Sequence, residues 1–70
     1  MVFNLFRRKG VDKLYVAIPE DIAVPEFVTG DRWSFAGRID SSSNVPAGFN
    51  WMAAEVAKRY NGFYLFQTTD

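Results

Sequence analysis

Hydrophobic residues between Asn50 and Gly62 recur with the period of an α-helix. Asn50 suits the helix N-cap, because its side-chain oxygen can accept a hydrogen bond from a free backbone N–H of the first turn. Gly62 reaches the left-handed conformation that ends a helix without a Cβ penalty. The pattern predicts an amphipathic helix over about residues 50–61, with Glu55, Lys58 and Arg59 on its polar side. We expect its apolar side to lie on a sheet through Met52, Ala53, Val56, Ala57 and Tyr60.

Trp51 does not fit this division, since it falls on the polar side near Glu55 and Lys58. Two interpretations remain open for its indole. It can pack back on the entry loop 45–49, as residues at helix starts often do. Alternatively, it can stand exposed as an anchor for a partner, because Trp is enriched at binding hot spots.

Three stretches have the pattern of β-strands. Residues 13–18 alternate apolar and polar side chains, which is typical of a half-buried strand. Residues 32–39 predict a second strand, with Trp33, Phe35 and Ile39 facing one way; Gly37 marks a bulge or a close helix crossing. Residues 63–69 begin apolar on both sides, which indicates a strand that is central in its sheet or covered on both faces.

Residues 20–28 and residues 1–10 each allow more than one structure. Residues 20–28 could open a short helical turn that Pro25 ends, and residues 26–28 could then pair back on residue 32 onward through the turn 29–31. Residues 40–44 form a polar linker. Residues 1–10 could be a short strand or turn covering one end of the core, or a frayed, flexible terminus. They could also be a membrane foothold, in which apolar groups insert and Arg7, Arg8 and Lys9 meet anionic headgroups.

These elements predict a single α+β domain over residues 1–70. We expect a small antiparallel sheet of three to four strands with one amphipathic helix on one face. The chain has no room for a second core at 70 residues. It also has no Cys, so no disulfide stabilises it. Because 49% of the residues are hydrophobic and 17% aromatic, the core is rich, and self-association is one outlet for apolar surface that a monomer cannot bury.

Charge and residue types narrow the classes of function. The formal net charge is zero, which weakens long-range attraction to nucleic acid, although the start of the chain is basic and residues 20–31 are acidic. The serines at 41–43 have no His to activate them, and the glycines are too scattered for a phosphate-binding loop. The acidic residues match no calcium-binding loop. We therefore expect no enzyme, no cofactor and no metal site.

The sheet face opposite the helix is the best candidate surface. We expect the helix to cover Leu14, Val16, Ile18, Trp33, Phe35, Ile39, Phe63 and Leu65. The opposite face then carries Lys13, Tyr15, Arg32, Ser34, Arg38, Tyr64 and Phe66. It interleaves aromatic rings with cations, which suits a protein partner and equally a single-stranded nucleic acid, unless a chain segment covers it. The sequence predicts a small non-catalytic module in the cytoplasm that binds another protein or a second copy of itself, as an inhibitor or adaptor of a larger protein. Nucleic-acid binding is the first alternative, and membrane association through residues 1–9 is the second. The expected contact residues are Trp51, Tyr15, Arg32, Arg38, Tyr64 and Phe66.

Overall fold

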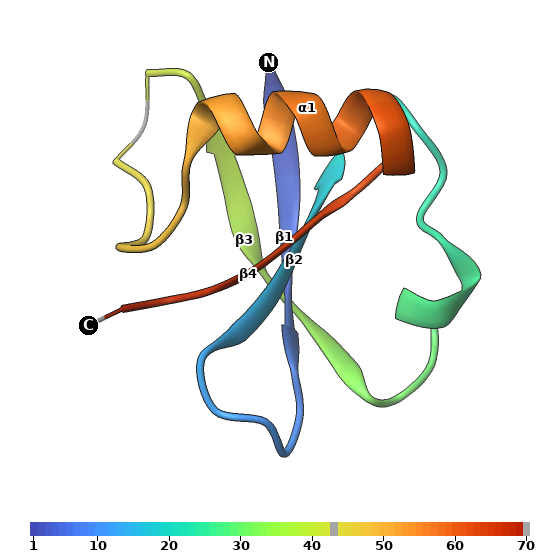
Figure 1. The fold of residues 1–70 in the computed structure, drawn as a ribbon. Helices are drawn as coiled ribbons and strands as arrows, with labels where there is room; N and C mark the ends of the chain where they lie inside the picture. The colour runs from blue at the N-terminus through green and yellow to red at the C-terminus, as the bar shows by residue number, and fades with distance from the viewer. Residues whose placement is uncertain (43, 70) are drawn as a thin grey trace.

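A computed structural model describes residues 1–42 and 44–69 and has an α+β fold (Figure 1). Four antiparallel strands form one sheet in the order β3-β1-β2-β4, and a single α-helix packs against it. This confirms the expected fold class. In chain order the elements are β1 (Val2–Arg8), β2 (Leu14–Pro19), the 3-10 helix η1 (Glu26–Val28), β3 (Trp33–Asp40), α1 (Trp51–Asn61) and β4 (Tyr64–Gln67). The predicted linker 40–44 includes Ser43, which lies outside the described residues.

Strand β1 occupies the centre of the sheet, between β2 and β3. Its alternation places Phe3 and Leu5 in the core, where both side chains are buried. Of the alternatives for residues 1–10, the strand is correct, but it runs through the core instead of covering one end. The membrane foothold needs apolar groups that face outward, and two of the four on this strand are buried.

A bulge in β3 changes which side chains share a face. Phe6 pairs with Phe35, whereas Leu5 pairs with Gly37, so the register shifts by one residue between these two pairs. Gly37 accommodates the bulge with a φ of +133°. The prediction that Trp33, Phe35 and Ile39 face one way was wrong for Ile39, because the extra residue turns it to the other face.

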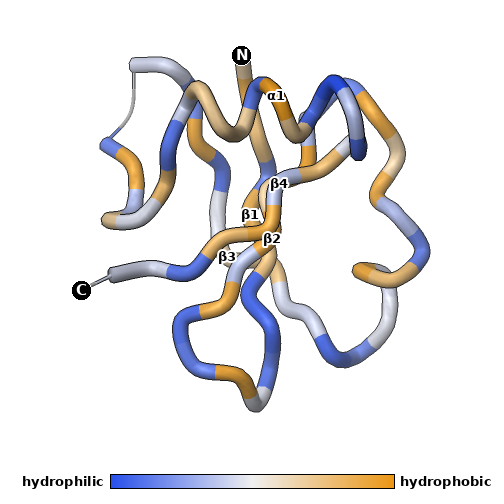
Figure 2. The backbone as a smooth tube through the Cα atoms, in the orientation of Figure 1, coloured by the Kyte–Doolittle hydropathy of each residue, from blue (hydrophilic) through white to orange (hydrophobic). Residues whose placement is uncertain are grey.

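The two faces of the sheet carry separate clusters. The face under α1 gathers the larger cluster: Phe3, Leu5, Ala17, Ile39, Phe49, Ala54 and Phe66. The opposite face gathers Val16, Ile18, Val28 and Trp33, where Val28 comes from η1. The sequence assigned Val16, Ile18 and Trp33 to the face under the helix, so that assignment was inverted. Figure 2 shows hydrophobic residues on β1, β2 and β4 in the middle of the sheet.

The connection after β2 also departs from expectation. Residues 26–28 form η1 instead of pairing with β3, and Thr29 Oγ1 donates to the Glu26 carbonyl at 2.8 Å to close the turn. Strand β4 pairs only with β2, so it lies at an edge of the sheet and not at its centre. Its Leu65 side chain is about half exposed.

Helix α1 begins and ends as the sequence predicts. The Asn50 side chain accepts a hydrogen bond from the Ala53 N–H at 2.9 Å. Gly62 is left-handed, with φ +83°, and its N–H donates to the carbonyls of Ala57 and Lys58. Neither α1 nor any other helix of the described chain is long and apolar enough to cross a membrane.

The rotation of α1 about its own axis is the main correction. Ala54 is fully buried against the sheet, and Trp51 is half-buried beside it. The side expected to be buried faces solvent instead, since Met52, Val56 and Tyr60 are 80%, 57% and 77% exposed. The prediction that these residues pack on the sheet was therefore wrong.

Candidate protein-binding surface

The six expected contact residues do not share one surface. Tyr15, Tyr64 and Phe66 lie on the face under α1, where their rings stack with centroids 5.7 Å (Tyr15–Phe66) and 5.4 Å (Tyr64–Phe66) apart. Phe66 is buried, and the ring of Phe49 meets it edge-on at 5.2 Å. These rings therefore pack as core under α1, whereas the sequence placed them on an open face away from the helix.

Trp51 also belongs to this ring cluster. Its indole lies 5.0 Å from the Phe49 ring and 6.0 Å from the Phe3 ring, measured between centroids. The packing interpretation on loop 45–49 is thus correct, and the indole reaches β1 as well. Only part of the indole remains accessible to a partner, because the side chain is half-buried.

The two arginines lie elsewhere. Arg38 pairs with Asn4 of β1, which puts it on the face away from α1, and its Nε donates to Glu20 Oε2 at 2.7 Å. The hydrogen bond from Arg38 to Glu20 and the charge of this carboxylate raise the pKa of Arg38. Arg32 is exposed just before β3, where its carbonyl accepts from the Lys9 N–H. The bulge in β3 explains why Arg38 and Tyr64 are on opposite faces.

A basic end of the sheet lies at the β1–β2 turn, far from α1 (Figure 1). Strand pairing brings the end of β1 next to the start of β3. The turn between β1 and β2 is mostly hydrophilic (Figure 2). The Arg8 guanidinium carbon lies 5.6 Å from the centroid of the Trp33 ring, an attractive cation–π arrangement. Phe35, 64% exposed, packs edge-on against Phe6 nearby. Five of the eight basic residues gather here: Arg7, Arg8, Lys9, Lys13 and Arg32.

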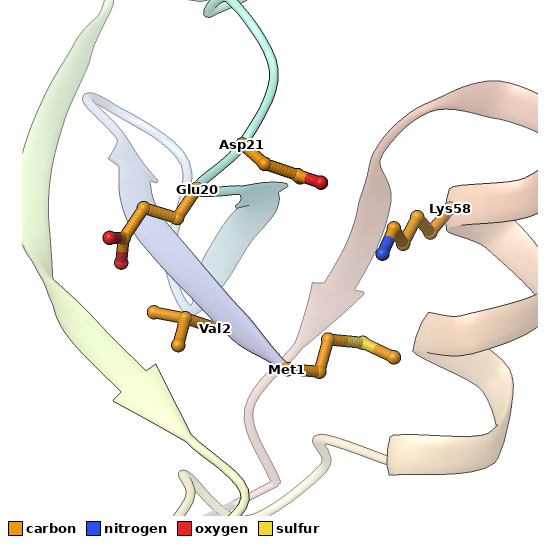
Figure 3. A pocket seen from close by; sticks show the side chains of 5 residues that line it. All are labelled: Met1, Val2, Glu20, Asp21 and Lys58. Atoms are coloured by element: carbon orange, nitrogen blue, oxygen red, sulfur yellow. The ribbon is translucent and has the colours of Figure 1, made fainter.

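A small cavity of about 340 Å³ lies between the start of β1, the end of β2 and α1. Figure 3 shows the Lys58 side chain extending from α1 toward this space, opposite Asp21 and the side chain of Met1. Val2 and Glu20 complete the lining. The lining offers one amine, from Lys58, and two carboxylates, from Glu20 and Asp21. Among the described residues no group of three or more acidic side chains is arranged to hold a metal ion.

The outer face of α1 is an apolar surface that the described part of the chain leaves uncovered. We define it by Met52, Ala53, Val56, Ala57 and Tyr60, which line one shallow groove with Asn50 and Asn61 at its two ends. Three large side chains in this set are more than half exposed. Contiguous apolar surface of this kind on a small protein marks an interaction site more often than chance exposure does.

Sequence reasoning identified these residues but placed them in the core. Ala54 marks the buried side of α1, where it forms a line at helical spacing with Trp51 and Lys58. The signal was present in the sequence, since a Trp on the polar side of a helix needs a place to pack. Comparison of the chain with protein-family models, with curated proteins and with solved structures found no match.

Proposed function

We propose that this chain is a small non-catalytic protein-binding module whose contact surface is the outer face of α1. The single observation that carries the proposal is the exposure of Met52, Val56 and Tyr60 on one side of a capped helix. Amphipathic helix recognition uses apolar residues at this spacing as its anchors. None of these three side chains belongs to either hydrophobic cluster of the fold.

The role as inhibitor or adaptor of a larger protein and the cytoplasmic location both belong to this proposal. Either role requires only that a folded surface be recognised. The contact residues expected from the sequence are replaced by the outer face of α1. Of the original six, only Trp51 lies on α1 itself.

Affinity capture from a lysate tests the proposal, with tagged wild-type chain compared to two variants of matched character. Val56→Glu places a charge in the middle of the outer face of α1. Phe35→Glu places the same charge at an equally exposed apolar residue on the other side of the sheet. In the presence of nuclease, we expect the wild-type chain to capture one protein in stoichiometric amount. Phe35→Glu should still capture this protein, and Val56→Glu should not. Retention by Val56→Glu would contradict the proposal.

Single-stranded nucleic acid is a second candidate, favoured by the basic end of the sheet. Cations there neighbour the exposed ring of Phe35, and such a combination contacts phosphates and stacks on bases. A labelled oligonucleotide titrated at low and high salt tests it, because phosphate neutralisation weakens steeply with salt. In that case capture would vanish with nuclease and with Phe35→Glu, and it would survive Val56→Glu.

A further inference from the structure

The outer face of α1 consists of two parallel rows with different side-chain sizes. Met52, Val56 and Tyr60 follow one another every four residues and form a ridge of large side chains. Ala53 and Ala57 form the adjacent row, which is a furrow because a methyl group barely rises above the backbone. Rows spaced by four residues are the ridges and grooves through which helices pack in globular proteins.

We propose that the partner of this surface is a second copy of the chain, docked helix against helix in antiparallel orientation. This inference rests on the proposed function, since it names the occupant of the same surface. A twofold axis that passes beside Val56 and Ala57 places the two ridges on one common line, where the large side chains of the two copies alternate along the helix direction. Such an interface is isologous, because one surface patch complements itself. The two Ala rows meet beside the ridges, and the helix axes lie within the usual range of about 8–10 Å.

The charges beside the ridge select the antiparallel arrangement. Glu55 and Arg59 lie along one flank of the outer face, and neither forms an ion pair with another described residue of its own chain. The twofold axis brings this flank of both copies together, while the two helices run in opposite directions. Glu55 of one copy then meets Arg59 of the second copy, and the reciprocal pair forms as well. A parallel twofold arrangement would instead bring this flank against the Ala row of the second copy, which leaves these charges without partners.

The dimensions of the surface match a short helix as its occupant. Asn50 and Asn61 bound the apolar strip at its two ends, so the strip is as long as α1. An 11-residue helix is about 16 Å long. A strip of this size is well below the roughly 800 Å² per partner of a standard stable interface. The dimer is therefore weak and reversible, and it forms with rising protein concentration.

Sedimentation of the full chain over about 1 µM to 1 mM tests the inference directly, since a weak dimer dissociates within this range. We expect a monomer–dimer equilibrium whose dissociation constant rises at least about tenfold in Val56→Glu, which buries a charge at the axis. The control Phe35→Glu should leave the dissociation constant unchanged. A wild-type chain that stays monomeric at the highest concentration overturns the inference.

Charge reversal distinguishes a second copy from any other occupant. Glu55→Arg makes the flank wholly basic, and Arg59→Glu makes it wholly acidic, so each variant should self-associate about threefold or more weakly. An equimolar mixture of the two should associate more tightly than either alone, and the double variant should recover the wild-type value. A mixture no tighter than its components overturns the antiparallel pairing.

The outcomes separate this inference from the function on which it rests. If the wild-type chain is monomeric while Val56→Glu still loses a captured protein, the second copy is wrong and the binding surface stands. If Val56→Glu affects neither sedimentation nor capture, both are wrong.

Discussion

Ala54 and Val56 are separated by one residue of α1, yet Ala54 is fully buried and Val56 is 57% exposed. The rotation of the helix that produces this difference follows from Trp51, whose indole packs between the rings of Phe3 and Phe49. Phe49 immediately precedes the helix cap and is itself buried, so the indole finds its apolar partners on that side. Once Trp51 is fixed there, helical spacing turns Ala54 to the sheet and Val56 to solvent.

Phe49 is the side chain on which this arrangement depends most. Its ring contacts four others, those of Phe3, Trp51, Tyr64 and Phe66, with centroids 5.0–6.0 Å apart. Phe49→Ala should lower the free energy of unfolding by about 3–5 kcal/mol, the cost of emptying a buried aromatic site. Urea unfolding followed by circular dichroism measures this loss.

Phe35→Ala is the matched control for that experiment. Phe35 is 64% exposed and contacts only the ring of Phe6 among the described aromatic residues. Its removal should cost less than about 1 kcal/mol. Equal costs for the two substitutions would mean that Phe49 is not central to the core.

Gly48 lies where a side chain cannot fit. Its φ is +100°, and a Cβ there would collide with the carbonyl oxygen of Gln67 at the end of β4. Nearby, the Thr69 N–H donates to the Ala47 carbonyl at 3.0 Å and holds the two segments together. Gly48→Ala should therefore lower the free energy of unfolding by about 1–3 kcal/mol and reduce the melting temperature.

Gly10 separates the conformational part of this cost from the collision. Its φ is +81°, and no atom lies within 4 Å of a Cβ built on it. Gly10→Ala should cost only about 1 kcal/mol, from the left-handed backbone alone. If Gly10→Ala melts as low as Gly48→Ala, the close approach of Gly48 to β4 is not the cause.

The ion pair between Glu20 and Arg38 should contribute little to stability. The side chains are 47% and 56% exposed, so water and salt screen their attraction. The raised pKa of Arg38 gives stability that is present below its unfolded pKa and is lost only as pH rises through its folded pKa. Since arginine titrates above about pH 12, no pH dependence from Arg38 appears near neutrality.

Glu20→Gln tests that assessment. We expect its urea midpoint to match wild type at both low and high salt, with no change in the salt dependence. A midpoint that falls clearly below wild type at low salt, and recovers at high salt, would show that the pair stabilises the fold.

The sequence predicts most of the secondary structure because helix caps and strand alternation depend on residues that are close together in the chain. Asn50 and Gly62 cap α1 as expected, and alternation in residues 13–18 locates β2 to within one residue. The fold class follows from these elements. Strand β1 was harder to predict, because its short apolar run precedes three cations, and its central place depends on pairing with residues of β3, from Arg8–Trp33 at one end to Val2–Asp40 at the other.

The prediction of which side chains face the core failed where one contact between residues far apart in the chain outweighs a periodic pattern. The apolar side of the helix predicts burial of Val56, but the packing of Trp51 on Phe3 and Phe49 decides the rotation. In β3 a single bulged residue moves Ile39 to the other face, although the alternation itself was recognised. Neither contact can be derived from local spacing alone.

The unfolding free energies of Ala54→Glu and Val56→Glu, measured in urea at low micromolar concentration, test the orientation of α1 most directly. With the outer face of α1 in solvent, Ala54→Glu should lose about 3 kcal/mol or more, because it buries an unpaired charge. Val56→Glu should stay within about 0.5 kcal/mol of wild type. If Val56→Glu unfolds the domain while Ala54→Glu is tolerated, the apolar side of α1 is core and the proposed binding surface does not exist.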